Sequence, residues 1–337
     1  MASLGFAGSR QWVYPQTVDG RFQRLRRWTF ALLHVVLFAT PWLTVNGNPA
    51  LRIDLPGRKL YALGAIFTPR DTILLLLLLL FLAFSLFFFT ALFGRIWCGY
   101  GCPQTVLLDT WIRPIERLIE GDRNARMRRD AGPWTWDKLW RKIHKWGAFV
   151  VVAVGVSMTL VSYFTGALPL WSGDASTEAY AIMGVGAGLL FLDFAWFREQ
   201  FCNFLCPYAR FQSVMVDRHS LLVSYDRGRG EPRGKDQRAR GGCIDCNKCV
   251  VVCPQGIDIR NGFQLECIAC ARCVDACTSV MAKIEQPTLV RYSTMAKDEG
   301  QRTRRIRPRT VVYSGLLTGI AAALVFLLGA RTTIEAS

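Results

Sequence analysis

The chain has 337 residues, of which 51% are hydrophobic and 12% aromatic, and its formal net charge is +16. In a soluble protein this charge would suggest nucleic-acid binding, but the 41 lysines and arginines gather in alternate segments between long apolar blocks. That distribution is typical of membrane topology and argues against a nucleic-acid partner. The twelve cysteines lie outside the central parts of the apolar blocks, and none is left over for a disulfide, which fits a reducing compartment.

Five apolar blocks approach or exceed the roughly 20 residues that cross a bilayer as a helix. They cover residues 27–45, 72–93, 147–170, 177–197 and 311–330. Of the lysines and arginines, 36 fall in residues 1–27, 94–146 and 198–310, against five in the other segments. By the positive-inside rule, these three basic segments are predicted to be cytoplasmic and the tail after 330 is predicted to lie outside.

Two similar motifs follow the second and the fourth apolar block. Each has an aromatic residue and then the pattern C-x-x-x-C-P, with Cys98 and Cys102 in the first and Cys202 and Cys206 in the second. If the helix continues through each motif, its two cysteines share one face, and the proline marks where the helix ends. We expect packing of the second span against the fourth to join the pairs into one four-thiolate pocket.

The spacing does not identify what this pocket would bind. Thiolates select Cu(I), zinc or iron-sulfur clusters. The alternative is that the four residues are unrelated buried thiols, since free cysteine also behaves as a small apolar residue. We favour a metal or redox site because the two pairs occupy equivalent positions and both precede a proline.

Asp193 lies near the inner end of the fourth apolar block. An intramembrane carboxylate is a functional candidate by default. Pairing with Arg198 at the membrane interface explains it equally well.

Residues 243–277 hold two copies of the pattern C-x-x-C-x-x-C-x-x-x-C, which is the run of bacterial two-cluster ferredoxins. In such a run the fourth cysteine binds the cluster of the other copy. One 4Fe-4S cluster is therefore predicted on Cys243, Cys246, Cys249 and Cys277, and the other on Cys267, Cys270, Cys273 and Cys253. Structural zinc lacks this interlocked spacing, and disulfides belong to oxidising compartments. Two one-electron centres that bind no substrate predict an electron relay.

Together these features predict an α-helical integral membrane protein with five transmembrane helices and an inserted cytoplasmic ferredoxin domain of the α+β class. The expected division is a cytoplasmic N-terminal segment, a four-helix membrane domain with both C-x-x-x-C-P motifs, the ferredoxin domain with its linkers, a fifth transmembrane helix and an outer tail. These parts cover residues 1–26, 27–216, 217–310, 311–330 and 331–337.

The motifs resemble the family of cytochrome c oxidase accessory proteins called CcoG, FixG or RdxA. The resemblance covers about residues 20–330 and is carried by three stretches: WCGYGCPQTV at 97–106, FCNFLCPYARFQ at 201–212, and the cysteine run from Cys243 to Met281. It implies a multi-pass protein of the bacterial inner membrane with a periplasmic C-terminus. Family members usually continue after the last span into a periplasmic immunoglobulin-like domain, whereas this sequence stops at Ser337, seven residues after Ala330.

The resemblance also implies a function. Such a protein would support assembly of the cbb-type oxidase as an oxidoreductase that reduces Cu(II) to Cu(I), with copper ions, oxidase assembly factors or copper chaperones and an unidentified electron donor as partners. The catalytic metal site would be Cys98, Cys102, Cys202 and Cys206, with copper or a third iron-sulfur cluster in the pocket. Two alternatives stay open: a quinol-linked membrane ferredoxin that supplies a partner reductase, and a redox-sensing assembly factor without turnover.

Overall fold

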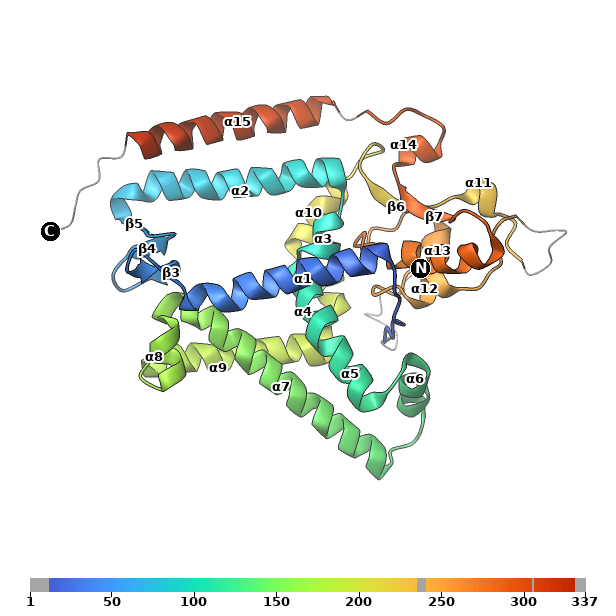
Figure 1. Cartoon of the computed structure of the whole chain (residues 1–337), viewed down its shortest axis with the longest axis horizontal. Helices are drawn as coiled ribbons and strands as arrows, with labels where there is room; N and C mark the ends of the chain where they lie inside the picture. The colour runs from blue at the N-terminus through green and yellow to red at the C-terminus, as the bar shows by residue number, and fades with distance from the viewer. Residues whose placement is uncertain (1–11, 235–240, 305, 331–337) are drawn as a thin grey trace.

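The computed structural model describes residues 12–234, 241–304 and 306–330, with the backbone only for Ser213. The predicted outer tail and the first eleven residues of the predicted N-terminal segment lie outside these ranges. Long helices fill one part of the molecule, and the ferredoxin domain sits at one end of them (Figure 1). These helices are α1 (Arg21–Ala39), α2 (Thr72–Phe93), α7 (Trp136–Thr165), α9 (Thr177–Leu192) and α15 (Pro308–Gly329).

Four helical segments are long and apolar enough to cross a membrane. They are Pro69–Phe93, Trp136–Thr165, Thr177–Phe197 and Pro308–Gly329, and they match four of the five predicted spans. α7 starts earlier than predicted because Thr135 caps it by accepting a hydrogen bond from the Lys138 amide. It ends at Gly166, whose φ of 92° is a left-handed conformation that favours glycine.

The first predicted span, 27–45, is not among these four segments. α1 begins at Arg21, so four arginines occupy its first two turns, and it ends at Ala39 before a short 3-10 turn, Thr40–Trp42. In Figure 1, α1 nevertheless runs beside the long helices, from the ferredoxin end towards the far end. The structure therefore supports four apolar spans and, alongside them, one helix with a basic start and an apolar remainder.

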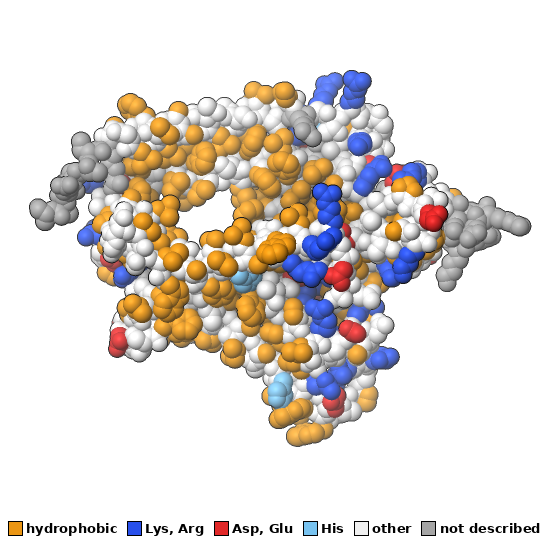
Figure 2. Space-filling model, in the orientation of Figure 1, with side chains coloured by type: hydrophobic (Ala, Val, Ile, Leu, Met, Phe, Trp, Pro, Cys, Tyr) orange, Lys and Arg blue, Asp and Glu red, His pale blue; other side chains and the backbone are white. Residues whose placement is uncertain are grey.

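The long helices form two pairs. α2 packs along α15, and α7 packs along α9. Figure 2 shows an opening through the apolar part of the molecule, between α2 and the helices below it. The second and fourth predicted spans therefore do not pack along each other within the described ranges, and that part of the sequence prediction is wrong.

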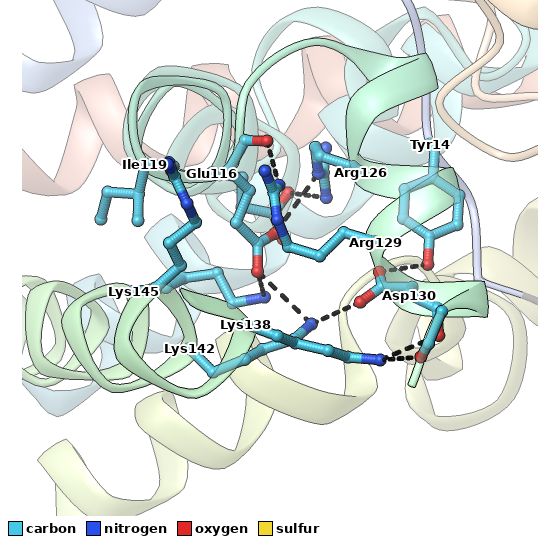
Figure 3. Close-up of polar contacts among 12 residues, drawn as sticks. Tyr14, Glu116, Ile119, Arg126, Arg129, Asp130, Lys138, Lys142 and Lys145 are labelled. Atoms are coloured by element: carbon cyan, nitrogen blue, oxygen red, sulfur yellow. Dashed lines mark hydrogen bonds and ion pairs between the residues drawn. The ribbon is translucent and has the colours of Figure 1, made fainter. Parts of the chain in front are cut away.

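Short helices join the pairs at the ferredoxin end. They are α3 (Ile96–Tyr100), α4 (Pro103–Leu107), α5 (Arg113–Glu120), α6 (Arg123–Ala131) and α10 (Pro207–Met215), with π-helical turns η3 (Leu108–Ile112), η4 (Asp193–Phe197) and η5 (Phe201–Leu205). Ile112 and Phe194 are fully buried against Phe149 of α7. A buried ion network adds to this packing: Glu116 pairs with Arg126, and Glu120 pairs with Lys145 (Figure 3). α5, α6 and α7 are thereby held together.

The far end of the helices carries short strands and one helix. A three-stranded antiparallel sheet joins β3, β4 and β5, and a two-stranded ladder joins β1 and β2. The elements are β1 (Thr44–Val45), β2 (Asn48–Pro49), β3 (Leu51–Asp54), η2 (Pro69–Asp71), β4 (Lys59–Ala62), β5 (Ala65–Phe67) and α8 (Ala167–Ser172).

The ferredoxin domain is an α+β unit around one antiparallel strand pair. β6 (Leu222–Tyr225) pairs with β7 (Val290–Ser293), and the core beneath them includes Val223, Leu289 and Val274. The other elements are α11 (Arg227–Gly230), α12 (Lys248–Val251), η6 (Ile259–Asn261), α13 (Arg272–Met281), η7 (Ala282–Ile284) and α14 (Met295–Asp298).

The start of helix α1 docks directly on the ferredoxin domain. Asp275 of α13 accepts hydrogen bonds from the amides of Phe22 and Gln23 at 3.2 and 2.7 Å. These amides belong to the first turn of α1, where no backbone acceptor is available. A Cβ on Gly20 would lie 2.3 Å from the Asp275 carboxyl carbon, so this close approach requires glycine. The ferredoxin domain is thereby fixed to the helices.

Candidate functional site

The eight cysteines of the ferredoxin domain line two neighbouring cavities. Cys243, Cys246, Cys249 and Cys277 line the first. The second is lined by Cys253, Cys267, Cys270 and Cys273, with Cys249 at the border between the two. The structure thus brings together the two sets of four that the interlocked spacing predicts, each with one cysteine from the other copy.

Both copies share an unusual backbone around their central cysteine. The residues on either side of Cys246, Asp245 and Asn247, have φ values of 51° and 56°. Those on either side of Cys270, Ala269 and Ala271, have φ values of 50° and 57°. Left-handed residues of this kind are uncommon outside glycine and cluster at functional sites. Successive amides in turns of this kind can form a concave nest, which is a known setting for iron-sulfur clusters.

The walls of both cavities are apolar, and this burial acts on the thiols. Burial raises the pKa of Cys249 and of Cys267 to about 12, and that of Cys253 to about 11. Such thiols stay protonated unless a cation takes the proton's place. The donor set therefore fits a positively charged iron cluster.

The two C-x-x-x-C-P motifs adopt the same local geometry. In each, the amide of the second cysteine bonds to the carbonyl five residues back: Cys102 to Trp97 and Cys206 to Phe201, both at 2.9 Å. The second cysteine then turns to an extended conformation, and the proline starts the next helix. Each motif therefore ends in a wider π-type turn, which closes the short helix α3 in the first motif and forms η5 in the second. Turns of this kind are often found at functional sites.

The four thiols of these motifs lie near one another, although α2 and α9 belong to different helix pairs. Burial raises the pKa of Cys202, and the neighbouring Cys102, Cys98 and Cys206 raise it further. Burial likewise raises the pKa of Cys98 to about 11. We refer to Cys98, Cys102, Cys202 and Cys206 together as the thiol pocket.

No group of three or more His, Cys, Asp or Glu side chains within residues 12–234, 241–304 and 306–330 is spaced to hold a single metal ion. A four-iron cluster is larger than one ion, so its ligands lie further apart than those of a single ion. In the thiol pocket, a single ion would need the thiols to draw together.

The thiol pocket lies directly against the loop of the second cluster cavity. Cys98 packs on Ile268 and Cys270 in one small apolar cluster, and both cysteines are 7% exposed. At the next residue, a Cβ on Gly99 would lie 2.6 Å from the Ile268 carbonyl and 2.9 Å from the Cys270 Cα. Only glycine allows the two backbones to touch in this way.

Several polar residues that were not predicted from the sequence stabilise the contact between the thiol pocket and the second cluster loop. The Cys98 thiol donates to the Gln212 Oε1 atom at 3.1 Å, and the Arg95 Nε atom donates to the same oxygen. Arg26 is fully buried; it donates to the Gly99 carbonyl and to Asp109. In the sequence, Arg26 belongs to the basic segment beside the first predicted span. Nothing in its local sequence distinguishes it from its exposed neighbours.

The structure also resolves the two readings of Asp193. Its carboxylate accepts from the Gln104 amide at 3.0 Å, and Gln104 directly follows the first motif. The guanidinium of Arg198 pairs with Glu116 at 2.7 Å, while only its backbone amide bonds to the Asp193 carbonyl. Of the two interpretations left open for Asp193, the ion pair with Arg198 is not among the pairs of the described residues; Asp193 instead bonds to the residue that follows the first motif.

Comparison with known families identifies two regions. Residues 197–295 match the family described as a 4Fe-4S dicluster domain. Residues 74–121, which include Cys98 and Cys102, match the family described as a 4Fe-4S binding domain. Together with the cavities above, these matches show that two 4Fe-4S clusters are cofactors of this chain.

Three relatives extend the comparison to the whole chain. Nitrogen fixation protein FixG of Rhizobium meliloti is 36% identical over 97% of this chain and 71% of its own length. Protein RdxA of Cereibacter sphaeroides is 35% identical over 96% of this chain and 73% of its own length. The ferredoxin-type protein NapH of Haemophilus influenzae is 23% identical over 60% of this chain and 66% of its own length. No solved structure matches the chain.

Proposed function

The chain belongs to the family of FixG, RdxA and RdxB, and on that premise we propose that it is a membrane-bound cupric reductase. As a 4Fe-4S ferredoxin-type protein it transfers electrons. The proposed reaction gives one electron to Cu(II) and forms Cu(I) at the thiol pocket. Its proposed role is to supply Cu(I) for assembly of a cbb-type oxidase, through assembly factors or copper chaperones.

The proposal assigns each ferredoxin cysteine to a cluster. Cys243, Cys246, Cys249 and Cys277 would hold one, and Cys253, Cys267, Cys270 and Cys273 the other, as their cavities suggest. When bound, the clusters supply one-electron transfer. The protein supplies the left-handed turns that aim backbone amides at them and the apolar walls that exclude water.

The contact between Cys98 and the Ile268–Cys270 loop is the observation that carries the proposal. Cys98 and Cys270 share one buried apolar cluster, so a metal held at the pocket lies beside the second cluster cavity. The thiols of the pocket are soft ligands, which favour Cu(I) over Cu(II). Binding at the pocket would therefore both promote the reduction and retain the product.

Serine substitutions separate the pocket from the cluster ligands. Replacing Cys98, Cys102, Cys202 and Cys206 by serine should abolish copper binding and Cu(II) reduction while leaving the iron content unchanged. Serine keeps the shape of the side chain and is a poor ligand for Cu(I). Iron, copper and the rate of Cu(II) reduction are measured anaerobically on purified protein. A quadruple variant that reduces copper at the wild-type rate contradicts the proposed copper site.

A second function is favoured by two observations on the same pocket. The described cysteines are not spaced for a single ion, and the 4Fe-4S binding domain match includes Cys98 and Cys102. A third cluster there would extend the relay towards a partner reductase or another acceptor, with quinol as a candidate donor. In that case the quadruple serine variant loses about four irons, and copper reduction must take place elsewhere.

The proposed orientation follows the distribution of basic residues and places the ferredoxin domain in the cytoplasm of a bacterium. The C-terminus is then periplasmic, and the protein resides in the inner membrane. Reporter fusions test this orientation: a fusion after residue 337 should be active only in the periplasm, and one within 294–304 only in the cytoplasm. A C-terminal reporter active in the cytoplasm contradicts the proposed crossing of α15.

A further inference from the structure

A large cavity lies between α1, the segment before it and helices α5 and α6. It has a volume of about 900 Å³, and it shares no cysteine with the cluster cavities or the thiol pocket. Six arginines line it against three aspartates, Asp19, Asp109 and Asp122. The arginines are Arg27, Arg113, Arg117, Arg123, Arg126 and Arg272.

The aspartates leave much of this positive charge unbalanced. Asp109 alone faces Arg26, Arg113 and Arg272 at 2.5, 3.1 and 3.7 Å. One carboxylate thus serves three guanidinium groups in a buried place. Asp19 pairs with Arg27 at the exposed rim.

Two of the lining arginines also have buried donor atoms without a partner in the described ranges. Arg272 is 6% exposed, and its Nε atom has no hydrogen-bond partner in the described ranges. The Nη1 atom of Arg113 is likewise buried without a partner there. Their other donors are fixed, Arg272 on the Gln16 carbonyl and Arg113 on the Pro254 carbonyl. These two atoms lie below the cavity surface, so they add positive charge behind its wall, while the guanidinium groups that reach the surface can bind phosphate with their planar fork.

Arg126, by contrast, is already committed to carboxylates. It pairs with Glu116 at 2.7 Å and with Glu120 at 3.6 Å, and its guanidinium lies over the Tyr14 ring. Figure 3 shows Arg126 between Tyr14 and Glu116 within the ion network. This side of the cavity is therefore a fixed wall.

The cavity changes from polar to apolar along α1. Gln23 and Arg27 line it near the start of the helix, and Phe30, Ala31 and Phe38 line it further along. These positions share one face of α1, since they are three, four or seven residues apart.

The remaining polar groups of the apolar part satisfy each other. The Trp111 indole donates to the His34 Nε2 atom at 2.8 Å, and the His34 Nδ1 atom contacts the Phe30 carbonyl at 2.7 Å. This part of the wall is therefore apolar, and the side chains of Trp111 and His34 need no hydrogen bond from a ligand. It suits an acyl chain.

We propose that this cavity binds an anionic phospholipid, with the phosphate at the arginines and an acyl chain along α1. Basic pockets beside membrane helices bind anionic headgroups in this way. A free phosphate compound shares the headgroup chemistry but makes no use of the apolar wall. The proposal stands whether or not the chain reduces copper, because no residue of the thiol pocket takes part.

The test uses the full chain, purified with its clusters in detergent. Native mass spectrometry measures the retention of phosphatidylglycerol, phosphatidylcholine, glycerol 3-phosphate and inorganic phosphate. Phosphatidylglycerol should bind, and phosphatidylcholine, whose headgroup has no net charge, should bind much more weakly. The paired substitution Arg117→Gln and Arg123→Gln should weaken phosphatidylglycerol binding about thirtyfold.

Two further variants separate the headgroup from the acyl chain. Arg128→Gln makes the same charge change on α6, at an exposed residue that does not line the cavity, and should bind like the wild type. Ala31→Trp fills the apolar wall at an exposed position, and should weaken phosphatidylglycerol while leaving glycerol 3-phosphate unaffected. Unchanged iron content shows that each variant is folded.

Three results would overturn the proposal. Equal retention of phosphatidylcholine and phosphatidylglycerol excludes an anionic site. If Arg128→Gln weakens binding as much as the paired Arg117→Gln and Arg123→Gln substitution does, the binding depends on general surface charge and not on the cavity. The third result has two parts: glycerol 3-phosphate or inorganic phosphate binds as tightly as phosphatidylglycerol, and Ala31→Trp has no effect. Together they exclude the lipid and leave only a phosphate site.

Discussion

The ferredoxin cavities and the thiol pocket are both built from repeated cysteine motifs, but they are assembled differently. Each cavity takes three cysteines from one loop, whose shape is fixed by left-handed residues beside the central cysteine. The thiol pocket takes two cysteines from each of two distant segments, and its helices α2 and α9 lie in separate pairs. The first kind of site depends on local chain geometry. The second depends on how the ferredoxin domain docks on the helices.

The largest expected effect is on the local sites. Cys270→Ser should remove about four of the roughly eight irons, because it removes the central ligand of one loop. Cys246→Ser should remove the other four. Iron content and the visible spectrum of anaerobically purified protein measure both effects. Wild-type protein with only four irons, or an unchanged iron content in Cys270→Ser, would contradict the division into two local sites.

Asp109→Asn removes a carboxylate from the contact between the helices and the ferredoxin domain, and it changes no cysteine. Asp109 is buried among Arg26, Arg113 and Arg272, and its loss leaves three buried charges without their carboxylate. We expect the free energy of unfolding to fall by about 3–5 kcal/mol, measured by denaturant titration. Asp19→Asn is the control, because its pair with Arg27 is exposed and should contribute little. Equal effects in both variants would contradict a special role for the buried group.

The same carboxylate predicts a pH dependence. It is buried, yet the charges of Arg26, Arg113 and Arg272 lower the pKa of Asp109 to about 2 in the folded protein, below its usual value of about 3.9. A depressed pKa gives stability that is fully present above about pH 4 and is lost as the pH falls towards 2. The difference between wild type and Asp109→Asn should therefore shrink over that range in denaturant titrations at stepped pH. A difference that stays constant from pH 5 to 2 would contradict this assignment.

Gly99→Ala tests the contact between the two kinds of site. The new Cβ would lie 2.6 Å from the Ile268 carbonyl, so the backbones must separate. We expect a loss of about 1–3 kcal/mol in unfolding free energy and slower electron delivery to the pocket, with iron content unchanged. Gly147→Ala is the control, because its Cβ meets nothing within 4 Å; it should be neutral or slightly stabilising. Stopped-flow reoxidation of the clusters by Cu(II) measures the rate, and an unchanged rate would contradict the contact as the route.

Tyr292→Phe should have the smallest effect. The Tyr292 hydroxyl donates to the Ala269 carbonyl at 2.6 Å, which supports the loop between Cys267 and Cys270 from outside. The same hydroxyl also contacts the Tyr100 hydroxyl at 3.4 Å, and we expect its removal to lower the unfolding free energy by about 0.5–1.5 kcal/mol. Thermal unfolding measures it, with the half-buried Tyr61→Phe variant in β4 as a comparison at the far end. A loss of iron in Tyr292→Phe would contradict the conclusion that the residues of the loop themselves fix its shape.

Local sequence was enough wherever neighbouring residues decide the structure. The predicted span 72–93 agrees with α2 residue for residue, because an unbroken apolar run has one favourable state in lipid. The span 27–45 was harder to place: its apolar content suggested a crossing, but α1 begins six residues earlier and includes four arginines. One of these, Arg26, is buried because it reaches Gly99 and Asp109, which no local pattern reveals.

By itself, the sequence determined the two cluster loops, the four apolar helices and the equivalence of the two C-x-x-x-C-P motifs. Each of these rests on spacing within a short stretch of chain. Only the tertiary structure decided that α2 pairs with α15 and α9 with α7, that the second cluster loop lies against Gly99, and that Asp109 gathers three arginines. These features join residues far apart in the chain, and many pairings of similar apolar helices satisfy the same sequence pattern. Buried polar contacts between the ferredoxin domain and the helices select one of them.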